Sequence, residues 1–208
     1  MHDYPWPALA LFAFVSSITP GPNNLLATAS GARFGLRRTL PQIAGVTAGF
    51  TVLLWLAASG VAALIVTHPA IGLLFAVAGY GYLVWLSGVL LYAAWKPRSI
   101  AREKIAALRP MTFVQSALFQ FANPKAWMMA LSGASSFLTG HGPSVAAIVA
   151  LCALFAVINF PCVGAWAAMG AHLQRWLHSP VATWRLRAFN ASMGATMLAT
   201  TGWMIATH

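Results

Sequence analysis

The sequence predicts an all-α integral membrane protein, with six transmembrane helices arranged as two inverted three-helix repeats and with helices 1 and 4 broken. Three observations lead to this fold class. Hydrophobic residues make up 60% of the 208 residues and charged residues only 7%, whereas a soluble domain carries about 25% charged residues. The basic residues fall between apolar segments in strict alternation, and two of those segments contain proline-centred polar patches. The mean hydropathy of +0.75 agrees with a chain that lies in lipid.

Six apolar segments can be marked, each long enough to cross the ~30 Å hydrocarbon core of a bilayer. They run over about residues 6–30, 40–67, 70–95, 113–138, 144–170 and 188–207. We therefore expect residues 1–208 to form a single transmembrane domain, with a first repeat at about 6–95 and a second at about 113–207. The cytoplasmic linker at about 96–112 forms either a short amphipathic helix or a solvated basic loop.

The Lys and Arg residues set the expected orientation. The loops after the first, third and fifth segments hold three, five and three of them, and the loops after the second and fourth segments hold none. Because Lys and Arg accumulate in cytoplasmic loops, we expect these three loops in the cytoplasm and both termini in the periplasm. The net charge of +10 is then a consequence of topology. Without a separate basic domain, it does not indicate nucleic-acid binding.

The first segment is interrupted by Pro20, Gly21 and Pro22, and Asn23 and Asn24 follow directly. Proline lacks an N–H group and clashes with the preceding turn, so a straight helix cannot continue through this stretch. Irregular backbone at membrane depth is tolerated only where it is buried in protein or lines a watery cavity. We expect a second half-helix to start here, with N–H groups that attract anions. The break then forms one wall of a solute site.

The fourth segment carries the counterpart break, around Gln120, Asn123 and Pro124, and it enters the membrane from the opposite side. Paired interruptions in two oppositely oriented halves are typical of inverted-repeat transporters with a site at the midplane. The alternative is coincidence, since proline is common in membrane helices. In the fifth segment, Asn159 and Pro161 are expected to interrupt the helix and to place another amide at the same site.

Lys125 lies about twelve residues into the fourth segment, ~18 Å along a helix. A lysine there costs roughly 2.5–3.5 kcal/mol on insertion scales. Its side chain either snorkels to the headgroups or faces the bundle interior. Asp3 and Glu103 lie outside the spans, so an interior Lys125 would meet a substrate carboxylate, water or backbone carbonyl groups. The substrate anion is the interpretation that we follow.

The amide side chains supply donors and acceptors for a substrate, although each could equally cap a broken helix or bridge two helices. The expected substrate-binding residues are Asn23, Asn24, Gln120, Asn123, Lys125 and Asn159. The expected hinges at the helix breaks are Pro20, Gly21, Pro22, Pro124 and Pro161. Together the two sets predict a transporter of a small zwitterionic molecule by alternating access.

Other residues are interpreted as structural. Gly45 and Gly49 are spaced for close helix packing. Cys152 and Cys162 fall on different faces of one predicted helix, ~15 Å apart, too far for an intrahelical disulfide. The two carboxylates and six histidines of the chain form no pattern typical of acid–base catalysis or of a metal centre. We therefore expect neither an enzyme nor a bound cofactor or metal.

Five motifs carry a family resemblance. They are TPGPNN at 19–24, GARFG at 31–35, AGVTAGF at 44–50, YLVWL at 82–86 and FQFANPKA at 119–126. With the first and last as the most specific, the chain resembles the LysE/RhtB (lysine exporter and homoserine–threonine exporter) family over essentially its whole length. The resemblance implies a bacterial inner-membrane exporter of amino acids or related metabolites, driven by the proton gradient and homodimeric.

One position departs from the family pattern, because this chain has Asn159 where some members carry an acidic residue in the fifth segment. Proton coupling would then use Lys125, a histidine near a membrane face or the titration of the substrate itself; otherwise the protein is a facilitator. Two alternatives come from related six-helix folds. A membrane-embedded thiol oxidoreductase would need paired cysteines at the two breaks, and a metal-ion exporter would need carboxylate or thiolate ligands there.

Overall fold

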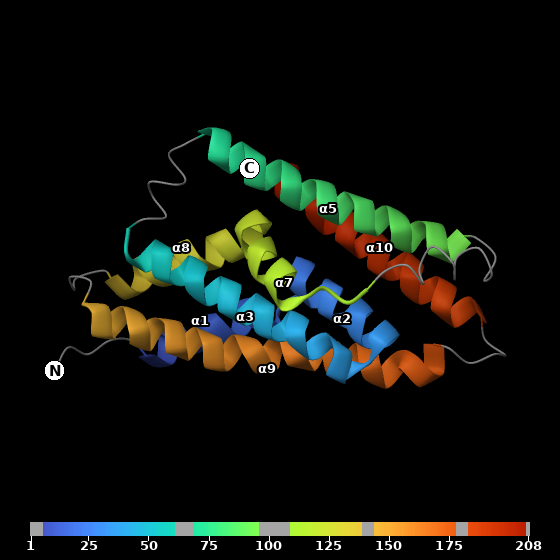
Figure 1. The fold of residues 1–208 in the computed structure, drawn as a ribbon, viewed down its shortest axis with the longest axis horizontal. Coiled ribbons are helices and arrows are strands. Elements are labelled where there is room, and N and C mark those ends of the chain that lie inside the picture. Colours follow the sequence, from blue (N-terminus) through green and yellow to red (C-terminus); the bar gives the residue numbers. More distant parts are fainter. Residues whose placement is uncertain (1–5, 61–68, 96–108, 139–143, 178–182, 207–208) are drawn as a thin grey trace.

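The computed structural model describes residues 6–60, 69–95, 109–138, 144–177 and 183–206 of the chain (Figure 1). All regular elements within these ranges are helices, and they follow the expected apolar segments in order. The all-α prediction is therefore confirmed. The linker at 96–108, with its expected choice between helix and loop, lies outside the described residues, as do Asp3 and Glu103.

The first segment consists of two helices, as its sequence predicts. Helix α1 (Trp6–Ile18) ends just before the proline pair, and α2 (Pro22–Phe34) starts with proline at its first position, where the missing N–H costs nothing. Helix α2 extends four residues beyond the expected end at 30 because the polar stretch up to Phe34 remains helical. Gly35, with a φ of 79°, then turns the chain into α3 (Leu36–Ala58).

The fourth segment is broken in the same way. Helix α7 (Phe113–Phe119) begins with a capping box, in which Thr112 and Gln115 bond each other's backbone. It passes into the 3₁₀ turn η1 (Gln120–Ala122), and α8 (Pro124–Leu138) again starts on a proline. Each broken segment thus contains a helix, a short non-α stretch and a second helix opened by proline.

The expected interruption of the fifth segment is wrong. Helix α9 (Val145–Leu177) runs for 33 residues and includes Pro161. Pro161 lies on the exposed face of the helix, where its ring and the unpaired carbonyl group of the preceding turn do not disturb the bundle. Proline is tolerated in this way within membrane helices. The sequence shows that a proline is present, but the face on which it lies decides whether the helix ends.

Two long helices flank the broken ones. Helix α9 packs against α1 and α2, while α3 packs against α7 and α8, and α3 and α9 also contact each other. Helices α5 (Pro69–Trp95) and α10 (Thr183–Ala206) pair along one edge of the bundle (Figure 1). A Cβ at Gly45 or Gly49 would come within 2.2 Å or 2.3 Å of a carbonyl oxygen of α7. This contact confirms that the glycine pair serves helix packing.

The outer surface of the bundle is apolar. Large hydrophobic side chains are exposed on several helices, including Phe14, Val52, Val77 and Val157. Among the described residues, Leu36–Ala58 and Val145–Leu173 are long and apolar enough by themselves to cross a membrane. Exposed apolar surface of this extent is incompatible with water and suits lipid.

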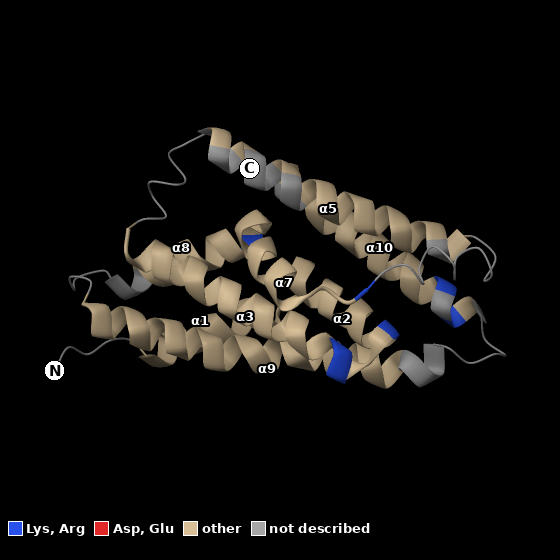
Figure 2. Cartoon of the chain, viewed as in Figure 1, with Lys and Arg blue, Asp and Glu red and all other residues tan. Residues whose placement is uncertain are grey.

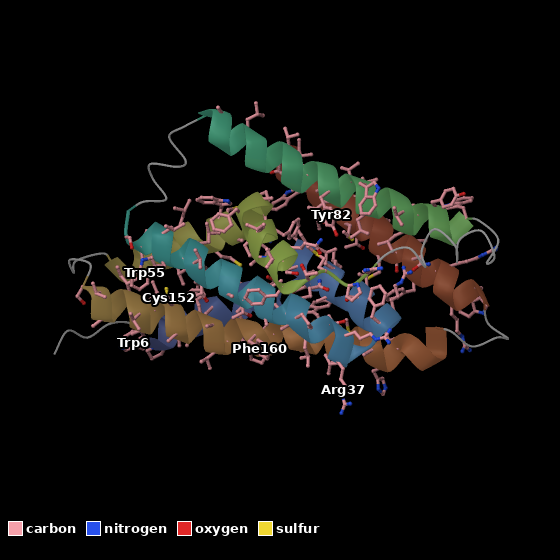
Figure 3. All side chains as sticks on the ribbon, viewed as in Figure 1. Trp6, Arg37, Trp55, Tyr82, Cys152 and Phe160 are labelled. Atoms are coloured by element: carbon pink, nitrogen blue, oxygen red, sulfur yellow. The ribbon has the colours of Figure 1, made fainter. Side chains whose placement is uncertain are left out.

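The described basic residues gather at one end of the bundle, around the end of α2 and the start of α3 and α10 (Figure 2). Arg37 at this end points away from the bundle (Figure 3). Lys125 is separate from them in the chain, as the second residue of α8. The arginines therefore mark one end of the molecule.

Candidate functional site

The carbonyl groups at the end of α1 have no partners within the helix, because the last turn of any helix leaves them unpaired. Side chains from elsewhere bond them. The Asn24 amide donates to the oxygens of Ser17 and Thr19, both at 2.8 Å. The indole of Trp166 on α9 donates to the Ile18 oxygen at 2.9 Å. The first break is thus held open by hydrogen bonds rather than by the prolines alone.

Lys125 completes this cap from the other half of the chain. Its Nζ donates to the Thr19 carbonyl oxygen at 2.8 Å, to the Thr19 hydroxyl at 3.0 Å and to the Pro20 carbonyl oxygen at 3.3 Å. The side chain is half-buried and reaches across to the first break. Of the two interpretations drawn from the sequence, these contacts favour a lysine that reaches into the bundle over one that snorkels to the headgroups. Backbone carbonyl groups, which were among the expected partners, occupy the ammonium in this conformation.

Gly21 allows this approach. A Cβ there would lie 2.7 Å from Cδ and 3.0 Å from Nζ of Lys125. The backbone of Gly21 is extended, with a φ of −176°, so any residue could adopt its conformation. A side chain at this position would meet only the flexible end of Lys125, which would have to shift.

At the second break, two amide side chains have different tasks. Asn123, which is 1% exposed, accepts a hydrogen bond from the Lys125 backbone N–H at 3.2 Å and so caps the start of α8. Gln120 forms a reciprocal amide pair with Asn23, at 2.8 Å and 3.1 Å, and also donates to the Ser116 oxygen at 2.9 Å. The amide pair joins the two breaks across 97 residues of sequence.

Asn159 brings α9 into the same cluster. It donates to the Ser17 hydroxyl at 3.2 Å and accepts from the Thr47 hydroxyl of α3 at 3.1 Å. All six side chains expected to bind substrate therefore line one cavity between the breaks. These residues are Asn23, Asn24, Gln120, Asn123, Lys125 and Asn159. Pro161 lies apart from them, in an apolar groove with Phe14 and Ile18.

The cavity is small in this conformation. Its volume is about 20 Å³, and a single water needs about 10–15 Å³ measured in this way. The breaks therefore close around no more than about one water molecule. We name this group of six polar side chains the break cluster.

The two half-helix starts differ in their electrostatics. Helix α8 has its first N–H groups partly satisfied by the Asn123 side chain. Helix α2 has Gly21 before it and no side-chain cap. Unsatisfied N–H groups at a helix start carry a partial positive charge, so the start of α2 attracts an anion more strongly than the start of α8. Lys125 lies directly over this position, which adds a full positive charge.

Sequence reasoning missed several partners of the break cluster. Ser17 and Thr19 carry a signal that could have identified them, because Thr19 directly precedes Pro20 and Ser17 lies in the turn before it. Thr47 and Trp166 lie on other segments and have no local signal. Cys152 and Cys162 are both free and buried on α9, and neither lines the cavity between the breaks. Among the described residues, no group of three His, Cys, Asp or Glu side chains could hold a metal ion.

Comparison with known proteins is consistent with this architecture. The family model for the LysE type translocator matches residues 14–205. The cysteine/O-acetylserine efflux proteins of Escherichia coli K12 and of Shigella sonnei Ss046 are each 31% identical to this chain over 165 residues, which is 79% of this chain and 81% of theirs. No solved structure matches. The chain therefore belongs to the LysE type translocators, a family of membrane transport proteins and not of enzymes.

Proposed function

We propose that this protein exports a small amino acid or related metabolite across the bacterial inner membrane by alternating access, driven by the proton-motive force. The observation that carries the proposal is the break cluster, in which polar side chains from both halves meet at two helix breaks. The relatives named as cysteine/O-acetylserine efflux proteins support the class of substrate. Their substrates share an α-amino group and a carboxylate, and we infer the same for this chain.

The helix contacts support two inverted repeats. Helix α3 packs against α7 and α8, and α9 packs against α1 and α2; α5 packs against α10, and α3 against α9. Exchanging the first three segments for the last three leaves this pattern unchanged. In each repeat, the residue that follows the first proline of the second half-helix reaches across to the break in the other repeat. Asn23 reaches from α2 to the second break, and Lys125 reaches from α8 to the first.

The substrate carboxylate binds at the uncapped start of α2 and against Lys125. Both groups are positive there, and no acidic side chain occurs among the described residues. The amide oxygens of the break cluster, such as that of Asn159, accept from the substrate amino group. Because the cavity holds about one water molecule in this conformation, the breaks must separate before the substrate enters.

Substrate binding is thereby linked to movement of the two repeats. To reach a carboxylate, Lys125 exchanges the carbonyl oxygens of Thr19 and Pro20 for the substrate, and the Asn23–Gln120 pair opens. A ligand shifts a conformational equilibrium only by its different affinity for the two states. The exchange of backbone carbonyl groups for a carboxylate supplies such a difference. Pro20, Gly21, Pro22 and Pro124 are the proposed hinges of this movement, whereas Pro161 lies within the unbroken α9.

The arginine-rich end faces the cytoplasm and both termini face the periplasm, following the positive-inside rule.

Proton coupling uses Lys125, a histidine near a membrane face or the substrate itself, since Asn159 cannot titrate. The homodimer follows from the family resemblance. Size-exclusion chromatography with light scattering in detergent tests the dimer, and labelling of cysteines introduced near each terminus tests the orientation.

Transport in everted vesicles tests the proposal. Their outer surface is the cytoplasmic face, so export appears as accumulation inside. A panel of labelled cysteine, O-acetylserine, serine, threonine, homoserine and lysine would be supplied with and without a pH gradient. We expect accumulation of at least one of them above control vesicles, with dissipation of the gradient lowering it. No accumulation of any member would remove amino-acid export from consideration.

The two alternatives have their own tests. A thiol oxidoreductase requires its cysteines, so the Cys152→Ala/Cys162→Ala double variant distinguishes it from an exporter. We expect the double variant to keep the wild-type transport rate, because both thiols are buried on the same helix and neither lines the cavity between the breaks. Loss of function in a folded double variant would favour thiol chemistry. Including radioactive divalent cations in the vesicle assay tests a metal-ion exporter.

A further inference from the structure

A second cavity, of about 150 Å³, lies at the arginine-rich end of the bundle. It is enclosed by α2, α3, α5, α10 and the stretch just before α7. Its polar lining residues are Ser30, Arg33, Gln42, Tyr82, Arg109 and Asn190. It shares no lining residue with the cavity of the break cluster. We call it the arginine cavity.

Gln42 is the unexplained residue of this cavity. It is 2% exposed, and its side-chain oxygen has no hydrogen-bond partner among the described residues. A buried acceptor without a donor costs about 1–3 kcal/mol, so such groups are rare in folded proteins. Asn190 on α10 lines the same cavity and is also buried, at 7% exposed. Gln42 lines the cavity, and a ligand N–H group would satisfy its buried oxygen once the side-chain amide turns toward the cavity.

Two guanidinium groups give the same cavity a positive side. Arg33, in the last turn of α2, is half-buried and lies over the Phe34 ring at 5.0 Å. Arg109 lines the cavity from the stretch before α7. Arginine presents a planar fork of donors that matches a carboxylate. Arg37 and Arg38 are fully exposed in the same region, so they serve the positive-inside rule without contributing to the cavity.

We propose that the arginine cavity is an entry site for the zwitterionic substrate on the cytoplasmic side. The substrate carboxylate binds Arg33 and Arg109, and its ammonium group donates to the Gln42 oxygen. The cavity combines a cationic side with a buried, unsatisfied acceptor. An α-amino acid has a group for each of them, whereas a simple anion would leave Gln42 unpaired. The inference rests on the proposed function, because it assigns that substrate a second site.

The sizes of the two cavities support this order of events. The break cluster encloses about one water molecule, whereas the arginine cavity is several times larger, at about 150 Å³ against about 20 Å³. In this conformation a substrate from the cytoplasm fits the arginine cavity and not the break cluster. It is held there until the breaks separate.

The test measures the concentration dependence of O-acetyl-L-serine uptake into everted vesicles. We expect Arg33→Gln and Gln42→Met each to raise KM by about tenfold, the effect of losing one hydrogen bond to a charged group, with the maximal rate preserved. Arg37→Gln is the matched control, since it removes the same charge from an exposed position, and its KM should equal that of the wild type. Arg33→Lys keeps the positive charge that membrane insertion needs. It should also raise KM, because lysine lacks the planar fork of donors that matches a carboxylate.

Blocked analogues assign each end of the substrate. N-acetylation removes the ammonium group, so the N-acetyl analogue should compete poorly in the wild type. In Gln42→Met the difference in competition between O-acetylserine and the N-acetyl analogue should become smaller, because the acceptor is gone from the entry site while the break cluster still binds the amino group. The methyl ester of O-acetylserine lacks the carboxylate, so it should compete poorly in the wild type. In Arg33→Gln the difference between the ester and O-acetylserine should become smaller. Equal competition by parent and N-acetyl analogue in the wild type would overturn the assigned orientation.

The outcomes separate this inference from the proposed function. Unchanged KM in both Arg33→Gln and Gln42→Met, while Lys125→Met abolishes uptake, would overturn the entry site and leave the exporter standing. No uptake of any amino acid by the wild type would remove both. A lipid headgroup offers similar chemistry, so the assay is repeated in phosphatidylcholine proteoliposomes. If the KM differences vanish there, the cavity binds lipid and the inference is wrong.

Discussion

Replacing Lys125 with methionine separates the role of its charge from the role of its packing. Methionine retains most of the apolar length of the side chain but cannot donate to the first break. The variant loses three contacts of Nζ, to the Thr19 oxygen, the Thr19 hydroxyl and the Pro20 oxygen. We expect it to fold, to insert and to lose transport.

The contacts indicate why the fold should survive. The Thr19 oxygen keeps its hydrogen bond from Asn24 at 2.8 Å. The Pro20 oxygen loses its lysine donor at an exposed position, so the cost is at most that of an unsatisfied buried acceptor, about 1–3 kcal/mol. Removing a lysine from the middle of a membrane helix relieves about 2.5–3.5 kcal/mol on insertion scales. These opposing terms are of similar size, so the net change in stability should be small.

Transport should respond differently, because methionine offers nothing to a substrate carboxylate. Loss of a hydrogen bond to a charged group, about 1.5–3 kcal/mol, lowers the transport rate at low substrate concentration by at least about tenfold. Uptake into everted vesicles gives the rate, and thermal unfolding in detergent gives the stability. Arg38→Gln serves as control, since it removes an exposed positive charge. Normal uptake by a folded Lys125→Met protein would refute the role of the ammonium group.

Two further predictions concern packing and the amide pair. Gly31→Ala should prevent folding, because its Cβ would lie 2.0 Å from the Ala167 carbonyl oxygen and such overpacking costs about 3 kcal/mol or more. The yield of monodisperse protein measures this, and Gly164→Ala, with nothing within 4 Å, should express normally. Asn23→Leu and Gln120→Leu should each destabilise by about 1–3 kcal/mol, since the remaining amide is left unpaired. In the double variant the loss should be smaller than the sum, and strict additivity in thermal unfolding would argue against the pair.

Most of the helical pattern could be predicted from local sequence. The apolar segments and both proline-centred breaks depend on hydrophobicity and on the missing proline N–H, which are properties of short stretches. The ends of the helices were less predictable, as α2 and α9 continue past their apolar runs to Phe34 and Leu177. The expected break at Pro161 was wrong because local sequence does not report which face of a helix carries the proline.

The membership of the site was also predictable, since a polar side chain at membrane depth needs a partner and the breaks are where partners occur. All six expected side chains line one cavity. Their hydrogen bonds were not predictable. Asn123 caps α8, whereas Asn23 pairs with Gln120, although both are asparagines beside a proline at a helix break.

The sequence by itself determined where the chain spans, where it breaks and which polar groups lie at the breaks, because these follow from the hydrophobicity and backbone chemistry of neighbouring residues. Only the tertiary structure decided that Lys125 bonds the carbonyl groups of Thr19 and Pro20, and that its side chain passes close over Gly21. It also decided that Gln42 is buried without a partner beside Arg33. Such contacts join residues that are distant in sequence, and they depend on how whole helices pack against one another.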